Sequence, residues 1–206
     1  MDLVMEHVHI SHVSKTGKLI PSVGFPAGKT CRVDAPCIKK CYARKGRFAF
    51  THNKNLLQKN LYIWQNDPEF FRREIILAAF PAKFFRWFPS GDIPDPNFLE
   101  MMVDLTYDVP GTRFLAFTKK DDIVNDYLDH HPMWDQDHLV IFLSAWGSFM
   151  PKNPHNLPIA YVNLKDEECQ IPEDAFRCPK FCGDCVFSHE SCWDKRCGES
   201  VVFDEH

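Results

Sequence analysis

Three cysteines in the first quarter of the chain have the residue type and spacing to hold a metal centre. Cys31, Cys37 and Cys41 form a C-x5-C-x3-C arrangement directly after a short apolar segment. A disulfide uses two thiols, whereas a cubane iron–sulfur cluster can take three and leave one iron open. This loop therefore predicts a [4Fe–4S] cluster with an open iron, the arrangement that an enzyme would need.

Two other interpretations of the same loop stay open. It could hold zinc completed by a distant histidine such as His52, or a structural cluster closed by a fourth cysteine. Thiolate-rich sites accept both zinc and iron–sulfur, so the ligand type alone does not decide. Structural zinc sites usually pair ligands two residues apart, and the loop lacks that spacing, which favours the cluster.

A second cysteine group lies near the end of the chain. Cys182-x2-Cys185 is typical of a metal knuckle, with Cys178 and Cys192 as natural third and fourth ligands, and Cys197 could replace Cys192. Such a density of thiols indicates a metal without specifying which one. A structural zinc site and an iron–sulfur cluster are close to equal alternatives here.

The composition is that of a globular domain, with 45% hydrophobic and 25% charged residues in a chain of 206. The net charge of −4 argues against non-specific binding to nucleic acid. Residues 39–47 form one basic run, which is more typical of a solvated loop face than of a phosphate contact. The composition and charge therefore do not favour nucleic acid as a partner, although it stays possible.

The cysteine content also predicts a compartment. Nine cysteines in a chain that starts without a signal peptide, and that has no apolar run near the ~20 residues of a membrane span, indicate a reducing environment. The odd number fits metal ligands better than a fully paired disulfide set. We expect the cytoplasm of a bacterial or phage-infected cell, and no membrane partner.

Apolar strand patterns alternate with helical patterns along the chain. Asp67 and Asp95 are expected N-caps because each precedes a proline, which suits the first helical position. The expected strands are residues 20–25, 83–88, 112–118, 138–144 and 159–164, and the expected helices are 55–64, one from 67, 95–107 and one ending near 128.

This order predicts an α/β fold, either a partial parallel β/α barrel or an open sheet of about five strands. Five strands are too few for a closed eight-stranded barrel. We expect a barrel domain at residues 1–168, carrying the cluster loop, and a cysteine-rich C-terminal metal-binding extension at 169–206.

Polar residues follow the expected strands, at the edge where α/β proteins bind ligands. Ser90-Gly91-Asp92 follows the second strand, Lys119 the third and Ser144 the next. The alternative for Ser90-Gly91-Asp92 is a tight turn whose Asp caps the following helix.

Several of these motifs resemble known families. Cys37-x3-Cys41-Tyr42-Ala43-Arg44 resembles the cluster loop of some radical S-adenosylmethionine proteins, whose usual spacing is C-x3-C-x2-C, and Ser90-Gly91-Asp92 lies where that superfamily has a Gly-Gly-Glu-like turn. The whole chain more closely resembles the phage and plasmid "gene product 88" family. The shared features are Lys15-Thr-Gly-Lys-Leu19, the loop from Thr30 to Arg47, Arg86-x3-Ser90-Gly91-Asp92, the Phe-Thr-Lys strand end and a cysteine tail ending in Val-x-Phe-x-x-His206.

The resemblance implies an iron–sulfur protein of the radical S-adenosylmethionine type, although whether it is an enzyme stays open. Cys31, Cys37 and Cys41 would hold the catalytic cluster, the cofactor site would be lined by Ser90, Gly91, Asp92 and Lys119, and the tail cysteines would bind a second centre. An electron donor and an unidentified small or macromolecular substrate would be its partners. The alternative function is a non-catalytic protein, stabilised by zinc or iron–sulfur, that binds nucleic acid or a protein partner through the basic loop near Arg44 and Arg47.

Overall fold

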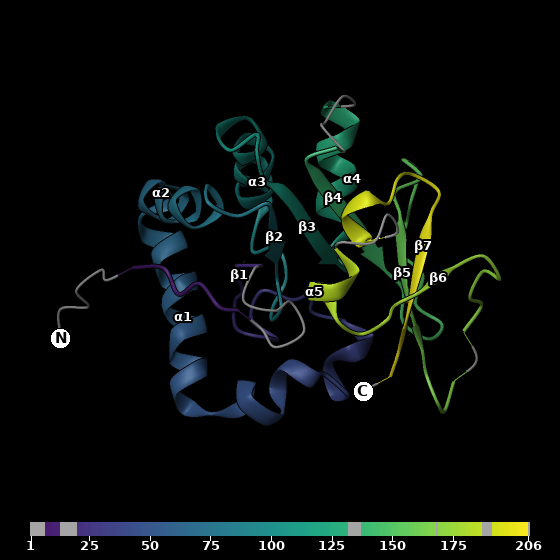
Figure 1. The fold of residues 1–206 in the computed structure, drawn as a ribbon. Helices are drawn as coiled ribbons and strands as arrows, with labels where there is room; N and C mark the ends of the chain where they lie inside the picture. The colour runs from purple at the N-terminus through teal and green to yellow at the C-terminus, as the bar shows by residue number, and fades with distance from the viewer. Residues whose placement is uncertain (1–6, 13–19, 132–136, 168, 187–190, 206) are drawn as a thin grey trace.

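The fold is an open sheet of parallel strands with helices packed on one face (Figure 1). The structure, a computed structural model, describes residues 7–12, 20–131, 137–167, 169–186 and 191–205. Within these residues the sheet has seven strands in the order β1-β2-β3-β4-β5-β7-β6, and every neighbouring pair is parallel. The strands are β1 Ser22–Val23, β2 Phe84–Trp87, β3 Arg113–Thr118, β4 Leu139–Ser144, β5 Ile159–Asn163, β6 Phe176–Arg177 and β7 Ser200–Asp204.

The α-helices occur mainly between the first four strands, as the alternating pattern predicts. They are α1 Thr51–Asn66, α2 Pro68–Ala79, α3 Pro96–Asp108, α4 Asp121–His130 and the one-turn α5 Cys182–Cys185. Short 3₁₀ turns are η1 Pro36–Lys39, η2 Tyr42–Arg44, η3 Gly46–Ala49 and η4 Cys192–Asp194. Both expected N-caps are confirmed, since the Asp67 and Asp95 carboxylates accept hydrogen bonds from the N–H groups of Phe70 (2.9 Å) and Phe98 (3.0 Å).

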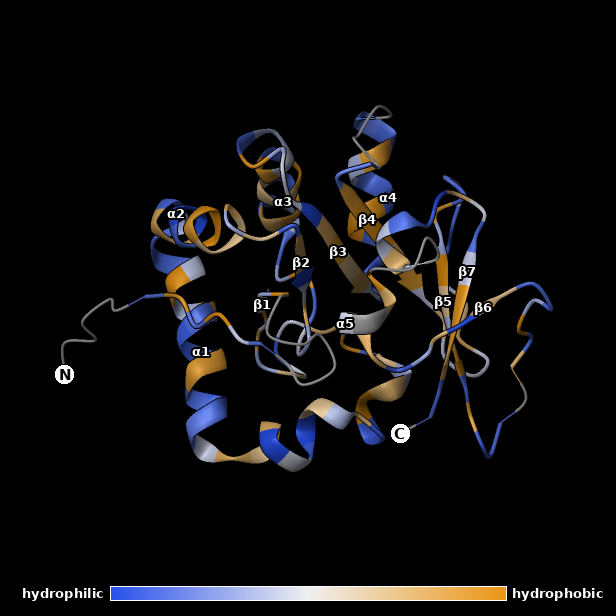
Figure 2. Cartoon of the chain, in the orientation of Figure 1, coloured by the Kyte–Doolittle hydropathy of each residue, from blue (hydrophilic) through white to orange (hydrophobic). Residues whose placement is uncertain are grey.

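Alternate residues of the central strands face two separate hydrophobic clusters. In β2, Phe85 packs in the cluster that includes helix residues such as Phe71 and Phe98, whereas Phe84 packs with Trp193 of the C-terminal tail. Because side chains alternate between the two faces of a strand, the helices cover one face and the tail lies on the other. Figure 2 shows the resulting concentration of apolar residues on β3 and β4, in the interior of the sheet.

The C-terminal region contributes strands to the same sheet. β7 pairs with β5 over five residues, from Ile159↔Ser200 to Asn163↔Asp204, and β6 pairs with β7. The expectation of about five strands was therefore too low, because these additions are short and their partner lies outside the local sequence. The expectation that the sheet does not close into a barrel is confirmed, since β1 and β6 are its two open edges.

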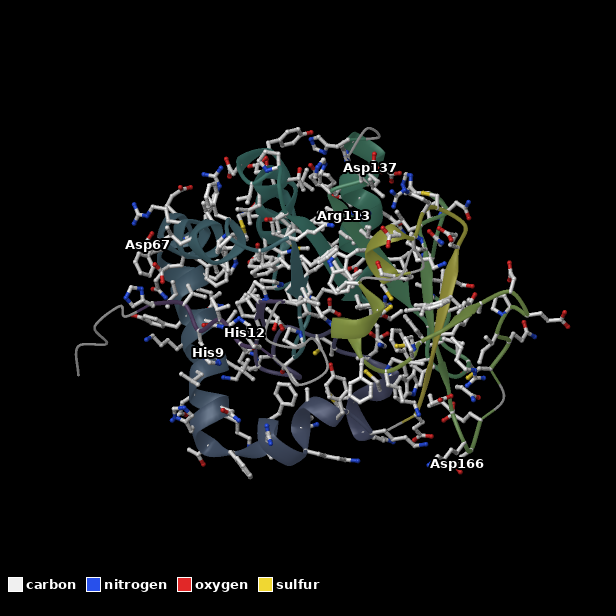
Figure 3. The ribbon with its side chains drawn as sticks, viewed as in Figure 1. His9, His12, Asp67, Arg113, Asp137 and Asp166 are labelled. Atoms are coloured by element: carbon white, nitrogen blue, oxygen red, sulfur yellow. The ribbon has the colours of Figure 1, made fainter. Side chains whose placement is uncertain are left out.

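The tail is anchored to the start of β3 through Arg113 (Figure 3). Its Nη1 atom lies 2.5 Å from Asp194 Oδ1, its Nη2 donates to the Trp193 carbonyl, and its Nε donates to the Asp137 carbonyl at 3.2 Å. One arginine thus ties η4 and the segment before β4 to β3. Among the helices that the structure describes, none is long and apolar enough for a bilayer crossing.

Candidate metal and cofactor site

Asp92 joins the carboxyl ends of two neighbouring strands. Its side chain is 5% exposed and accepts hydrogen bonds from Thr118 Oγ1 (2.5 Å), the Lys119 N–H (3.0 Å) and the Ile93 N–H (2.8 Å). Burial raises the pKa of Asp92 above its ordinary value, and the hydrogen bonds from Lys119 and Thr118 oppose that rise. Asp92 therefore fixes the end of β3 against the end of β2.

The Ser90-Gly91 turn is bound just as closely to the start of the cysteine loop. Ser90 Oγ donates to the Phe25 carbonyl at 2.8 Å, and the Phe25 N–H donates to the Ser90 carbonyl at 2.8 Å. Gly91 has φ +78°, and a Cβ there would lie 2.6 Å from Thr30 Oγ1 and 2.8 Å from the Phe25 carbonyl oxygen. Only glycine fits this conformation and this approach. The cofactor role expected for the turn stays a prediction.

The three loop cysteines surround the same edge of the sheet. All three are free thiols of intermediate exposure, and the Gly28 N–H donates to Cys31 Sγ at 3.3 Å. Burial raises the pKa of Cys31, and the charges of Asp92, Cys41 and Cys37 raise it further. Burial likewise raises the pKa of Cys37, while Lys119 opposes that rise.

These mutual effects place residues from three successive strand ends in one electrostatic neighbourhood. The charge of Asp92, after β2, contributes to the raised pKa of Cys31, and the Lys119 ammonium, after β3, opposes the rise in the pKa of Cys37. The Lys119 ammonium also lies 5.7 Å from the centre of the Trp146 ring, which follows β4. The structure thus brings together residues that the sequence assigned to one cofactor site, and their binding role remains to be tested.

Four tail cysteines form the second group. Cys185 and Cys192 are each 8% exposed, and Cys178 and Cys182 pack on the same cluster as Trp193. Burial raises the pKa of Cys192 far above the ordinary thiol value, and Cys178, Cys185 and Cys182 raise it further. Their role as one ligand set stays a prediction.

Cys197 and Cys169 have different surroundings. Cys197 packs against the cluster on the helix-covered face, and its thiol donates to the His155 carbonyl at 3.8 Å. The Cys169 thiol approaches the Glu167 carbonyl at 3.9 Å. Cys197 and Cys192 thus pack against different hydrophobic clusters, and which of them is the fourth ligand stays a prediction.

Arg86, on β2, is the site residue that the sequence reasoning did not assign a role. Its Nη1 atom lies 3.6 Å from Cys182 Sγ, and its guanidinium carbon lies 5.4 Å from the centre of the Phe117 ring. Its Nε atom is buried and has no hydrogen-bond partner within the described part of the chain. A charged residue inside the apolar run Phe84–Trp87 is the sequence signal that could have identified it.

The donor chemistry of both groups fits a soft metal centre. No set of three or more His, Cys, Asp or Glu side chains in the described part of the chain is arranged as a ready metal site. However, the donors are thiols, and the buried Arg86 Nε, beside Cys182, has no hydrogen-bond partner among the residues that the structure describes. A thiolate centre would supply negative charge beside this guanidinium.

Taken together, the fold and the site define an open, all-parallel α/β protein with a thiol-rich carboxyl edge. The chain belongs to the gene product 88 family, whose model matches residues 7–192. This confirms the family expected from the motifs, of which Lys15–Leu19 and His206 lie outside the described residues. No curated protein and no solved structure matches the chain.

Proposed function

We propose that this protein is a radical S-adenosylmethionine-like iron–sulfur protein with a second metal centre in its tail. The observation that supports the proposal is that the loop of Cys31, Cys37 and Cys41 begins beside the ends of β2 and β3. The Asp92 N–H donates to Thr30 Oγ1, next to Cys31, at 2.9 Å, and Asp92 accepts from the Lys119 N–H at 3.0 Å. Ligands of open α/β sheets bind at this edge. The bound cluster and cofactor would supply one-electron reduction that generates a substrate radical.

The roles of the protein's own residues follow from their contacts. The loop thiols would be the cluster ligands, and Cys178, Cys182, Cys185 and Cys192 would hold the second centre. Asp92 accepts three hydrogen bonds already, so we assign it to positioning the Lys119 backbone rather than to direct contact with the cofactor. The Lys119 ammonium would attract the cofactor carboxylate.

The test begins with protein purified without oxygen. Iron, sulfide and zinc are measured, and the electron paramagnetic resonance spectrum of the reduced protein is recorded with and without S-adenosylmethionine. We expect about eight iron atoms per chain for two [4Fe–4S] clusters, and a spectrum that the cofactor perturbs. About four iron atoms with an unperturbed spectrum would leave only a structural or electron-transfer centre, and zinc alone would refute the proposal.

Two pairs of variants test which residues bind the cluster and which residue binds the cofactor. Cys37→Ala should remove the iron of one cluster and the response to the cofactor. Cys169→Ala should keep both, because the Cys169 thiol lies outside the two cysteine groups, 3.9 Å from the Glu167 carbonyl. Lys119→Gln should weaken the spectral response without changing iron content. The adjacent Lys120→Gln is its control, because Lys120 Nζ donates to the Pro94 carbonyl at 3.2 Å. Equal responses of Lys119→Gln and Lys120→Gln would contradict the assignment.

A further inference from the structure

Positive charge is concentrated in one part of this acidic protein. Residues 26–66, from the end of β1 to the end of α1, contain nine Lys and Arg and one Asp, for a net charge of +8. The rest of the chain contains 15 Lys and Arg and 27 Asp and Glu, for a net charge of −12. The overall value of −4 therefore hides a strongly basic segment, and net charge alone is a poor guide to its partner.

Within this segment, Arg44, Lys45, Arg47, Phe50 and Lys54 form a surface that we call the basic arc. All five side chains are exposed. None of the four cations forms an ion pair with any residue that the structure describes, whereas nearby Lys40 pairs with Asp166 (3.3 Å) and Glu205 (3.1 Å). The arc's cations are thus available to an external anion.

Aromatic rings are interleaved with these cations. Phe50 is 64% exposed, between Arg47 and Lys54, and Tyr42 is 49% exposed, next to Arg44. Tyr42 also packs edge-to-face on Phe48 with ring centroids 5.9 Å apart, which holds its ring in place. Cations that follow a phosphate backbone, with exposed rings on which bases stack, are the features of single-strand binding proteins.

The arc also adjoins the candidate site. Tyr42 follows Cys41 directly, and its hydroxyl donates to the Pro89 carbonyl at 2.7 Å, next to Ser90. In Figure 1 the chain from η2 to the start of α1 runs along the lower edge of the molecule, toward which β3 points. A polymer held on the arc would therefore pass the carboxyl edge of the sheet.

We propose that the basic arc docks a single-stranded nucleic acid, with Arg44, Lys45, Arg47 and Lys54 on its phosphates and Phe50 stacked on a base. An acidic peptide would satisfy the cations but would leave the exposed ring without a planar partner. A duplex would meet the cations but keeps its bases stacked inside. The docking does not depend on which metal the cysteines hold.

The test measures fluorescence anisotropy of a labelled oligothymidylate of about 16 nucleotides, the upper end of a single-strand site. Each phosphate contact contributes about −0.7 to the slope of log K against log salt. Arg44→Gln/Arg47→Gln should therefore flatten the slope by about 1.4. Phe50→Ala should weaken binding by about 5- to 150-fold with little change in slope, from the usual stacking range.

A charge-matched control distinguishes binding by the basic arc from a general effect of the protein's charge. Arg73→Gln/Lys83→Gln removes the same charge from exposed positions on α2 and before β2, and should leave affinity and slope nearly unchanged. An equal loss in this control, an unchanged Phe50→Ala, or equal binding of a duplex or of polyglutamate would each overturn the proposal. The iron, sulfide and zinc contents of Phe50→Ala and of Arg44→Gln/Arg47→Gln should match those of the parent, so failure here is distinguishable from failure of the metal assignment.

Discussion

The Nη1 atom of Arg86 lies 3.6 Å from Cys182 Sγ, which joins the second strand to the cysteine tail across the face that the helices leave uncovered. The Arg86 side chain shares that face with Phe84, two residues earlier, and stacks over Phe117. Because the guanidinium stays charged at all ordinary pH values, a nearby thiolate centre is its natural counter-ion. The Arg86 guanidinium and a negatively charged metal–thiolate centre in the tail are therefore expected to stabilise one another.

Removing this charge should weaken metal binding by the tail. A hydrogen bond to a charged group contributes about 1.5–3 kcal/mol, so Arg86→Gln should lower tail metal affinity by roughly tenfold or more. The measurement is zinc retention against a competing chelator, in a background where Cys31, Cys37 and Cys41 are alanine. Arg86→Lys, which keeps the charge, should lose less, and equal retention by Arg86→Gln and the parent would contradict the pairing.

Gly91 should not tolerate a side chain. With φ +78° and a Cβ 2.6 Å from Thr30 Oγ1, Gly91→Ala combines backbone strain with a clash, and we expect a loss of roughly 1–3 kcal/mol or more in unfolding free energy. Denaturant unfolding measures this loss. Gly111→Ala is the control, because a Cβ there meets nothing within 4 Å, and a similar loss in both variants would refute the steric explanation.

The sequence alone was sufficient to predict the alternating strands and helices at the centre of the fold. Residues 83–88, 112–118, 138–144 and 159–164 are apolar enough to mark buried strands, and β2, β3, β4 and β5 occur there. β7 could not be inferred in the same way, because Ser200–Asp204 becomes a strand by pairing with β5, about 40 residues earlier in the chain. Local patterns do not reveal such a partner.

In the candidate site, too, local features could be predicted from the sequence and contacts between distant residues could not. Thiol spacing indicates two groups of cysteines because it depends on local chain geometry, and their assignment as metal ligands stays a prediction. The partner of Arg86 is 96 residues away and could not be read from the sequence. Nor could the two hydrogen bonds that Asp92 accepts from Thr118 and Lys119, which depend on β3 lying beside β2.

His9 should make stability depend on pH below neutrality. Burial lowers the pKa of His9 from 6.5, and the charges of His52 and Lys59 lower it further. The unfolded chain therefore binds a proton that the folded protein does not, and this contribution to stability is present above pH 6.5 and is lost as the pH falls through the native pKa.

The measurement compares unfolding free energies of the parent and His9→Gln between about pH 5 and 8, the window in which histidine titrates. We expect the parent to lose stability relative to the variant as the pH falls below 6.5. A parallel pH dependence of the two proteins would show that His9 does not carry the effect, and the opposite trend would show a native pKa that is raised.

Trp193 should be the main apolar anchor of the tail. It is 1% exposed, its Nε1 donates to the Phe85 carbonyl at 3.3 Å, and its ring meets Phe84 edge-to-face at 5.5 Å. Replacing a buried Trp by Ala commonly costs about 3–5 kcal/mol, so we expect Trp193→Ala to lower the unfolding free energy by that amount. Tyr107→Ala, at a site that is 67% exposed, should change it by less than about 0.5 kcal/mol.

A second readout separates anchoring of the tail from global stability. If Trp193 holds η4 and the tail cysteines on the sheet, Trp193→Ala should also expose Cys192 to a thiol reagent in metal-free protein under native conditions. Gly91→Ala, which strains the turn after β2 against Thr30 and Phe25, should not. Slow, unchanged labelling of Cys192 in Trp193→Ala would mean that Arg113 and its contacts to Asp194 are sufficient to keep the tail in place.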